Sequence, residues 1–271
     1  MHREKRRHIL ISVIQILLVG GLILLWEWGA KTERFDSFYT SYPSAIIKDI
    51  VEFYTSGDLW KHASITLQEA LSALIVGCFL GIIVAALFGQ FKILGSIFTP
   101  ILTAINSVPQ LTLAPLYILW FGLGLTSKVF LAGLMVFFVV FFATYGAINN
   151  IDRKLIEIST MLGAGTAQTW WHVILPACMP SILGGIRGGI GASIVGSIIG
   201  EYMGATAGFG WMVAYASSYF IVTRVMSCVF LLLFMGIILN YLLNFVESKI
   251  LRWHSQHQKN NKLAGNTMQE Y

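Results

Sequence analysis

Long apolar blocks, separated by short charged segments, dominate the pattern of this chain. The stretch between Arg7 and Glu27 holds 19 residues without Asp, Glu, Lys or Arg, and the stretch between Lys92 and Lys128 holds 35. A spanning helix needs about 20 mostly apolar residues, because roughly 30 Å of hydrocarbon is crossed at about 1.5 Å per residue. The pattern therefore predicts an all-α polytopic membrane protein. Its six predicted transmembrane helices cover residues 9–29, 66–89, 95–121, 128–149, 181–203 and 225–248.

Composition agrees with a membrane protein and excludes two other classes. Charged residues make up 11% of the 271 residues, whereas a soluble domain carries about 25%. The 56% of apolar residues excludes a disordered chain, which would be charged and poor in aromatic residues. The three cysteines lie in or beside apolar runs, so no disulfide framework is implied.

The few basic residues predict how the chain is oriented. With six spans both ends lie on one side, and that side, with the 90–94 turn and the 150–180 loop, holds 11 Lys or Arg against 6 on the other. Because cytoplasmic segments are richer in Lys and Arg, we expect both termini and this loop in the cytoplasm. The first span is expected to remain as an anchor, since Glu27 and Lys31 follow it where a signal peptide would have small residues.

Three regions are expected along the chain. Residues 1–65 comprise a cytoplasmic tail, the anchor helix and an extracytoplasmic amphipathic segment, residues 66–250 form the transmembrane core, and residues 251–271 form a cytoplasmic tail. In the amphipathic segment Pro43 can open a helix, and apolar residues recur at helical spacing until Gly57. We expect this helix at the outer membrane interface or packed against the bundle.

The sequence shows no catalytic machinery. It contains no Gly-rich phosphate loop ending in Gly-Lys-Ser/Thr, its six histidines lack ligand spacing, and no span has the rows of carboxylates typical of an ion relay. We therefore expect a protein that is not an enzyme and has no cofactor or metal of its own.

The loop at residues 150–180 is the most informative segment. Lys154–Leu162 is predicted to form a short helix that stops at Gly163 in the left-handed conformation. Thr166 is predicted to cap a second helix, which Pro176 prevents from continuing unchanged. From residue 158 to residue 186 there is no charged side chain, so this aqueous loop needs cover. Either it packs under its own bundle or it docks into another protein.

The order of residues in this loop resembles a known motif. From Glu157 to Pro176 the sequence is similar to the Glu-Ala-Ala-x3-Gly-x9-Ile-x-Leu-Pro motif in the permease subunits of bacterial binding-protein-dependent ABC importers. Every anchor residue has the family's spacing. The two alanines of the motif are Ile158 and Ser159 here, and its first isoleucine is Val173.

Three further segments look like the nitrate/sulfonate/taurine branch of this family, namely Pro109–Lys128, Leu183–Arg187 and Glu201–Gly210. The resemblance runs from about residue 60 to the C-terminal tail. It implies a type I ABC importer permease (MetI-like) architecture in the bacterial inner membrane. The implied partners are a second permease copy, two ATPase subunits that bind ATP and Mg, and an extracytoplasmic substrate-binding protein.

In this family the short helix of the loop sits in a groove of the ATPase and transmits its motion. The resemblance therefore implies an ATPase-coupling element in which Gly163 makes the turn, Pro176 ends the helix, and Glu157 makes a polar contact or cap. Its residues are Glu157, Ile158, Ser159, Gly163, Ala164 and Pro176.

Span five carries small residues in two adjacent helical rows, from Gly184 to Gly200 and from Gly185 to Ser197, which favour close helix packing. Arg187 is the one strong charge assigned to the interior of a span. We expect it to snorkel or to pair with a helix C-terminus; the alternative is contact with an anion in transit.

Two prolines interrupt span three and predict a kink or an unwound segment that faces protein or a cavity: Pro109 and Pro115. Polar residues near this kink and in span five are candidates for the translocation pathway. They are Gln110, Thr112, Tyr117, Arg187, Ser193, Ser197 and Glu201.

The sequence thus predicts the transmembrane permease subunit of an ABC importer. The resemblance makes a small anion, such as an aliphatic sulfonate, taurine or nitrate, the leading cargo, with a thiamine-precursor pyrimidine or another small organic molecule as the alternative. A stand-alone channel or secondary transporter would need ion-coupling residues or inverted repeats, which we do not find in the sequence. The lipid bilayer, and no nucleic acid, is the remaining expected partner.

Overall fold

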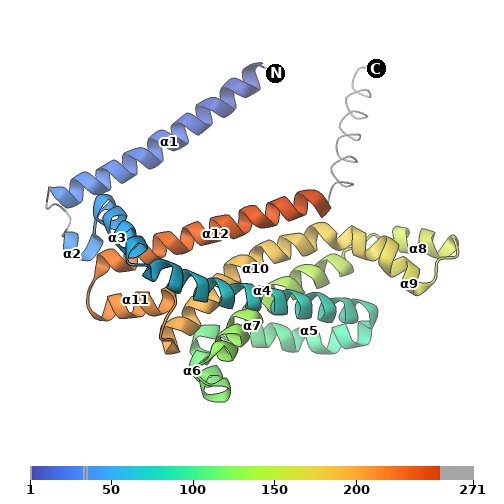
Figure 1. Cartoon of the computed structure of the whole chain (residues 1–271). Helices are drawn as coiled ribbons and strands as arrows, with labels where there is room; N and C mark the ends of the chain where they lie inside the picture. Colours follow the sequence, from blue (N-terminus) through green and yellow to red (C-terminus); the bar gives the residue numbers. More distant parts are fainter. Residues whose placement is uncertain (1, 33, 35, 251–271) are drawn as a thin grey trace.

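A computed structural model describes residues 2–32, 34 and 36–250, and all regular elements within these residues are helical. The predicted tail at 251–271 lies outside the described residues. The elements, shown in Figure 1, are α1 (His2–Lys31), α2 (Ser37–Thr40), α3 (Pro43–Thr55), α4 (Asp58–Gln90), α5 (Lys92–Asn106), α6 (Gln110–Phe121), α7 (Leu125–Asn149), α8 (Arg153–Met161), α9 (Thr166–Thr169), the π-helical turn η1 (Trp170–Ile174), α10 (Leu175–Gly204), α11 (Phe209–Ser218) and α12 (Val222–Ile250).

Five helical stretches in the described part are long and apolar enough to cross a membrane, and the bent pair α5 and α6 makes a sixth if it counts as one span. The kink or unwound segment predicted within the span at 95–121 is present as a break, at which α5 and α6 meet at an angle of 96°. Pro109 lies at this break, where its ring excludes a helical conformation from the residue before it. Pro115 lies inside α6 and does not end that helix.

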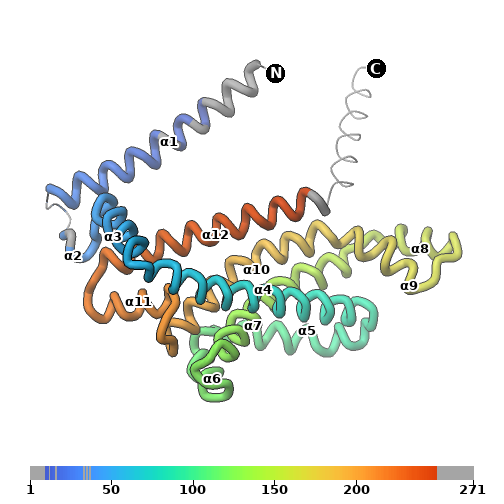
Figure 2. Tube along the Cα trace, in the orientation of Figure 1, coloured from blue at the N-terminus to red at the C-terminus, as the bar shows by residue number. Residues whose placement is uncertain are grey.

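Three helices, α4, α7 and α10, form the centre of the bundle, with α7 packed against both of the others. Figure 2 shows these three helices running side by side, with α12 beside α10. Glycine makes the close approach possible: a Cβ added to Gly77 of α4 would lie 2.6 Å from the carbonyl oxygen of Gly133 in α7. A Cβ on Gly196 of α10 would lie 2.5 Å from Cα of Ala132. Much of the small-residue face of span five is thus a packing face within one chain.

The amphipathic segment packs against the bundle, which is one of its two expected placements. The apolar face of α3 buries Ile46 and Phe53. On the same helix, Asp49 forms an ion pair with Arg224 of α12, with 2.9 Å between Oδ2 and Nε. The last turns of α1 join this region through Trp26, whose Nε1 donates to a backbone carbonyl 3.1 Å away in the α2–α3 connection.

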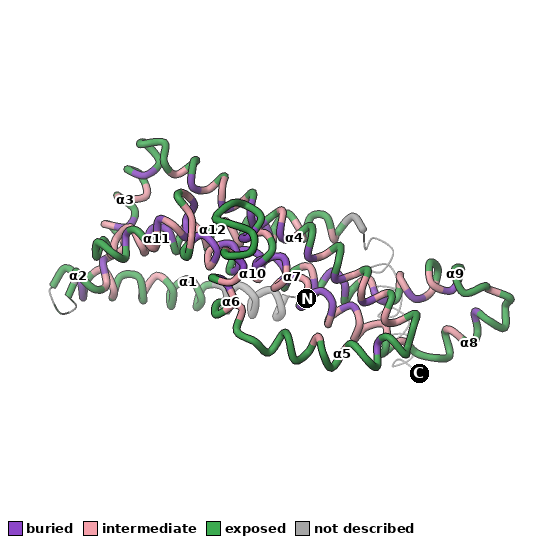
Figure 3. The backbone as a smooth tube through the Cα atoms, turned by 90° about the horizontal axis from the view of Figure 1, so that it is seen from below, coloured by how far each residue is buried: buried purple, intermediate pink, exposed green. Residues whose placement is uncertain are grey.

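The bundle has two unlike ends. At one end α8 and α9 project beyond the spanning helices, and Figure 3 shows that much of this projection is exposed. At the other end α2, α3, α6 and α11 gather around the ends of the long helices (Figure 1). Each end carries one candidate functional site.

Candidate functional site

The first site is the protruding segment, residues 152–174. The side chain of Asp152 caps the first turn of α8. The helix stops at Gly163, whose φ of +82° favours glycine, and the N–H of Ala164 donates to the carbonyl of Ser159 at 3.0 Å. The short helix and its glycine turn are therefore confirmed, with helix ends within one residue of those predicted.

The helix that follows does not end at Pro176. A continuous helical stretch runs from Thr166 to Gly204, and Pro176 lies in the first turn of α10. Proline has no N–H for the usual helical bond and crowds the carbonyl four residues earlier. The turn before it is π-helical, so the N–H of Leu175 donates to the carbonyl of Trp170 five residues back. This wider turn lets the chain accept the proline, so the predicted end at Pro176 is wrong.

The protruding segment is held on one side and open on the other. The hydroxyl of Ser159 in α8 is buried and lies 3.2 Å from the hydroxyl of Thr169 in α9. In contrast, Ile158 is 54% exposed, and Met161 and Leu162 are 85% and 83% exposed. The two readings of the apolar loop therefore apply to different parts of it: η1 packs on the bundle, whereas the end of α8 has no cover in the described chain.

Glu157 lies on the exposed part of α8. It has no hydrogen-bond partner among the described residues, and Asp152 is the residue that caps the helix. A cap by Glu157 is therefore excluded, and a polar contact with a partner stays a prediction.

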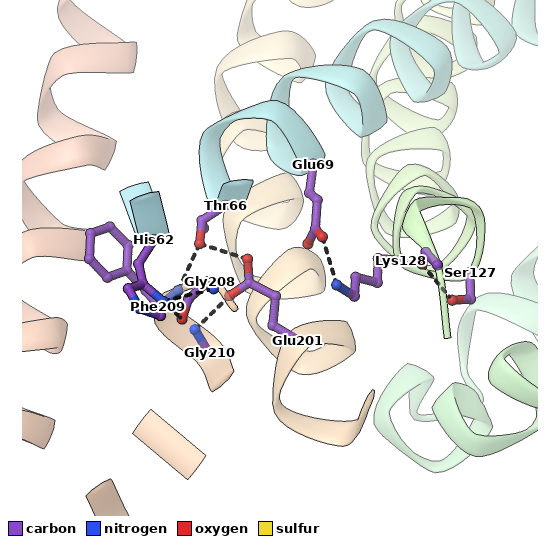
Figure 4. Close-up of polar contacts among 10 residues, drawn as sticks. His62, Thr66, Glu69, Ser127, Lys128, Glu201, Gly208, Phe209 and Gly210 are labelled. Carbon is purple, nitrogen blue, oxygen red and sulfur yellow. Dashed lines mark hydrogen bonds and ion pairs between the residues drawn. The ribbon is translucent and has the colours of Figure 1, made fainter. Parts of the chain in front are cut away.

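The second site is a buried polar cluster at the opposite end, where α4, α7, α10 and α11 meet (Figure 4). An ion pair joins two of the central helices within it: Nζ of Lys128 in α7 lies 2.8 Å from Oε1 of Glu69 in α4, and both side chains are buried. The removal of two charges from water is costly unless they are paired, so each of these side chains needs the other in the packed bundle.

Glu201, near the end of α10, is fully buried and accepts two hydrogen bonds. The hydroxyl of Thr66 in α4 donates to Oε1 at 2.6 Å, and the N–H of Gly210 in α11 donates to Oε2 at 2.6 Å. Thr66 in turn accepts from the N–H of Phe209 at 2.9 Å. Figure 4 shows how this chain of contacts ties the start of α11 to two long helices.

The histidine of the cluster continues this tie. The N–H of Gly208 donates to Nδ1 of His62 at 3.0 Å, and the imidazole stacks on the ring of Trp211 with centroids 5.4 Å apart. The φ of Gly208 is +110°, and a Cβ there would collide with the carboxyl group of Glu201. Glycine is therefore required at this position by both the backbone conformation and the space available.

The buried polar cluster has the properties of a structural contact between helices rather than of a catalytic centre. Its imidazole and the carboxylate of Glu201 are occupied by hydrogen bonds to backbone or hydroxyl groups, and its ammonium is paired. Among the described residues there is no group of three or more His, Cys, Asp or Glu side chains that could hold a metal ion. Its geometry can hold four helices together.

The structure distributes the pathway candidates over separate places. On α6 the buried Tyr117 donates from its hydroxyl to Oε1 of Gln110 at 3.3 Å, and Thr112 is exposed. On α10 Ser193 and Ser197 are fully buried, as is Glu201. The structure thus brings together two pairs or rows of candidates but not the whole set, and their roles in a pathway stay predictions.

Arg187 pairs with two side chains on α12. Its Nη2 lies 2.5 Å from Oε2 of Glu247 and donates to Oδ1 of Asn244 at 2.7 Å. It is not the one strong charge in a span, however, because Glu69 and Lys128 lie inside α4 and α7. Sequence reasoning singled out neither of these two, nor His62 or Thr66.

Comparison with known proteins identifies the family of this chain. The family described as "Binding-protein-dependent transport system inner membrane component" matches residues 77–252, so the chain belongs to this family. It is a multi-pass membrane protein, the permease of an ABC importer for a small solute.

Two curated permeases and one solved structure are similar to this chain over most of its length. The chain is 30% identical to the putative aliphatic sulfonates transport permease protein SsuC of Bacillus subtilis, over 90% of this chain and 88% of that protein. It is 27% identical to the taurine transport system permease protein TauC of Escherichia coli, over 90% and 91%. A chain of the MetNI methionine ABC transporter in an inward-facing conformation is similar in fold, with a TM-score of 0.53 and 19% identity over 73% of this chain and 94% of that one.

Proposed function

We propose that this permease carries a small anion, such as an aliphatic sulfonate, taurine or nitrate, and that two partner ATPase subunits supply the energy. Its similarity to the SsuC and TauC permeases over 90% of the chain supports this cargo class. ATP and Mg would be bound by the partner subunits, and a substrate-binding protein would deliver the cargo on the extracytoplasmic side. Two copies of this chain would enclose the pathway, with both termini in the cytoplasm.

The observation that carries the coupling part of this proposal is the bare end of α8. Met161 and Leu162 are large, apolar and more than four-fifths exposed, beyond the ends of the spanning helices. An exposed apolar surface in this position favours a protein partner over water. We place the ATPase groove around these two residues and Ile158, with Glu157 as the polar contact at its edge.

The way α8 is attached gives this contact a mechanical consequence. The Ser159–Thr169 hydrogen bond joins α8 to the helical stretch that becomes α10. Motion of an ATPase that grips α8 would therefore be applied to a spanning helix through Ser159 and the Gly163–Ala164 turn.

The coupling contact is tested by substitution of Leu162→Asp in the full permease, expressed with its ATPase. Loss of a central apolar anchor costs about 2 kcal/mol or more, so co-purification with the ATPase should fall by about thirtyfold, and transport with it. Tyr219→Asp is the matched control, since Tyr219 is 65% exposed at the opposite end of the bundle and should leave ATPase binding unchanged. Equal ATPase recovery with both variants would contradict the proposal.

The cargo is tested in proteoliposomes that contain the complete transporter. Uptake of labelled taurine, an aliphatic sulfonate and nitrate should depend on ATP and on the binding protein. ATP-driven uptake of a thiamine-precursor pyrimidine with none of the three anions would overturn the anion assignment while leaving the permease assignment intact. Uptake without any ATPase would overturn both and point to a channel or secondary transporter.

A further inference from the structure

A cavity of about 580 Å³ lies between the protruding segment and the ends of α4 and α7. Two basic residues line it, Lys92 at the start of α5 and Arg153 at the start of α8, and no Asp or Glu is among its lining residues. Neither basic residue takes part in an ion pair within the described chain. The neighbouring carboxylate, Asp152, caps α8 instead. The cavity therefore has positive charge that the described chain does not neutralise.

The surroundings of this charge suit an anion with several oxygen atoms. The start of α5 has no side-chain cap, so the positive end of a 15-residue helix adds to the charge of Lys92. Hydroxyl and amide groups that can donate hydrogen bonds to such an anion also line the cavity: Gln90, Tyr145, Asn149 and Thr166. By comparison, the cavity beside α3 mixes Lys48 with Asp49 and Glu52 and has no such excess of positive charge.

An apolar groove of about 690 Å³ adjoins the cationic cavity. The two share Gln90, Thr166 and Trp170 in their linings. Otherwise the groove is formed by apolar side chains of α4 and of the η1–α10 junction, among them Ile83 and Trp171. A ligand that fills both must therefore have an anionic head and an apolar tail. A soluble phosphate would leave the groove empty.

The depth of the site in the membrane agrees with such a ligand. Both α4 and α7 cross the membrane, and their final residues, at Gln90 and Asn149, border the cavity. The ends of spanning helices lie at the level of the lipid headgroups, where clusters of Lys and Arg attract anionic lipids. The start of α5 and the protruding segment lie at this same end of the bundle (Figure 1).

We propose that an anionic phospholipid binds here, with its phosphate between Lys92 and Arg153 and an acyl chain in the groove beside Trp170. The lipid would join the protruding segment to the bundle, so the bilayer would contribute to the position of α8. This inference does not depend on the identity of the cargo or on ATPase binding.

The test uses the full-length permease in phosphatidylcholine nanodiscs with and without phosphatidylglycerol, and native mass spectrometry to count retained lipid. Each basic residue near the surface should contribute about a fivefold preference for the anionic lipid at low salt. Lys92→Gln and Arg153→Gln should each lower that preference about fivefold, and the double variant about thirtyfold. Ala167→Glu, in the apolar groove, should also lower lipid retention.

Lys154→Gln is the matched control, because Lys154 is exposed on the same helix but does not line the cavity. Preservation of the phosphatidylglycerol preference in the double variant would overturn the proposal. An equal loss with Lys154→Gln would also overturn it, since that result indicates diffuse surface attraction. If inorganic phosphate displaces the lipid and binds unchanged in Ala167→Glu, the site is one for a soluble anion and the lipid assignment is wrong.

Discussion

The two ends of the helical stretch from Thr166 to Gly204 differ in how the side chains around them are covered. At its end, the polar side chains of Glu201 and Thr66 are fully buried and bonded to each other and to α11. At its beginning, α8 leaves Met161 and Leu162 bare. The comparison separates what this chain stabilises by itself from what it leaves for a partner to cover. Substitutions in the buried polar cluster should therefore lower the stability of the protein, and substitutions in the protruding segment should weaken the binding of a partner.

The largest expected effect is from Lys128→Met, which leaves the carboxylate of Glu69 buried without its partner. Removal of one member of a buried ion pair costs about 3–5 kcal/mol, so unfolding in a denaturing micelle titration should shift by that amount. Lys61→Met, on the exposed side of α4, is the control and should change stability by less than about 0.5 kcal/mol.

The double variant Glu69→Leu/Lys128→Met sharpens this test. It removes both charges and should recover much of the lost stability, because an apolar pair can replace a buried ion pair. A single variant as stable as the Lys61→Met control would show that the pair does not hold α4 against α7.

A smaller loss is expected from Thr66→Val, which keeps the shape of the side chain and removes its hydroxyl. The carboxylate of Glu201 then loses one donor and the N–H of Phe209 loses its acceptor, at a cost of about 1–3 kcal/mol. Thr112→Val on the exposed side of α6 provides the comparison in the same titration. If both variants unfold alike, the two hydrogen bonds of Thr66 drawn in Figure 4 contribute nothing measurable to stability.

The smallest effect is expected at the protruding segment, from Ser159→Ala. The lost contact with Thr169 should raise hydrogen exchange of α8 about fivefold, equivalent to about 1 kcal/mol, and leave global unfolding unchanged. Thr160→Ala is the matched control, because its hydroxyl bonds only within α8. A global destabilisation by Ser159→Ala would remove the distinction between the two ends.

Local patterns predicted the parts of this structure that depend on local physics. Five spans followed from the length of their apolar blocks, and the turn after α8 followed from Gly163, whose positive φ few other residues accept. The prediction that the helix ends at Pro176 was wrong because the rule for proline takes no account of the conformation of the preceding turn. The π-helical turn before Pro176 removes the clash on which that prediction depended, whereas the interruption predicted at Pro109 is present, with an angle of 96° between α5 and α6.

The buried polar cluster was beyond such rules. Glu69 and Lys128 are 59 residues apart, and in the sequence each only marks the edge of an apolar block. Glu201 was selected as a pathway candidate, but its partner Thr66 lies 135 residues away on another span. A single sequence contains no signal that pairs residues at such separations, so the cluster becomes visible only when α4, α7 and α10 are packed together.

The unbroken helix across Pro176 has a mechanical meaning. Its 39 residues, at about 1.5 Å each, form a lever about 58 Å long, with the protruding segment attached at Thr169 and the buried polar cluster at Glu201. If such a lever pivots near its middle, its two ends must move in opposite directions, and a swing of about 5° moves each end by about 2.5 Å. Access to the translocation pathway from one side of the membrane would then close as access from the other side opens, and the motion of this one helix would link the two events.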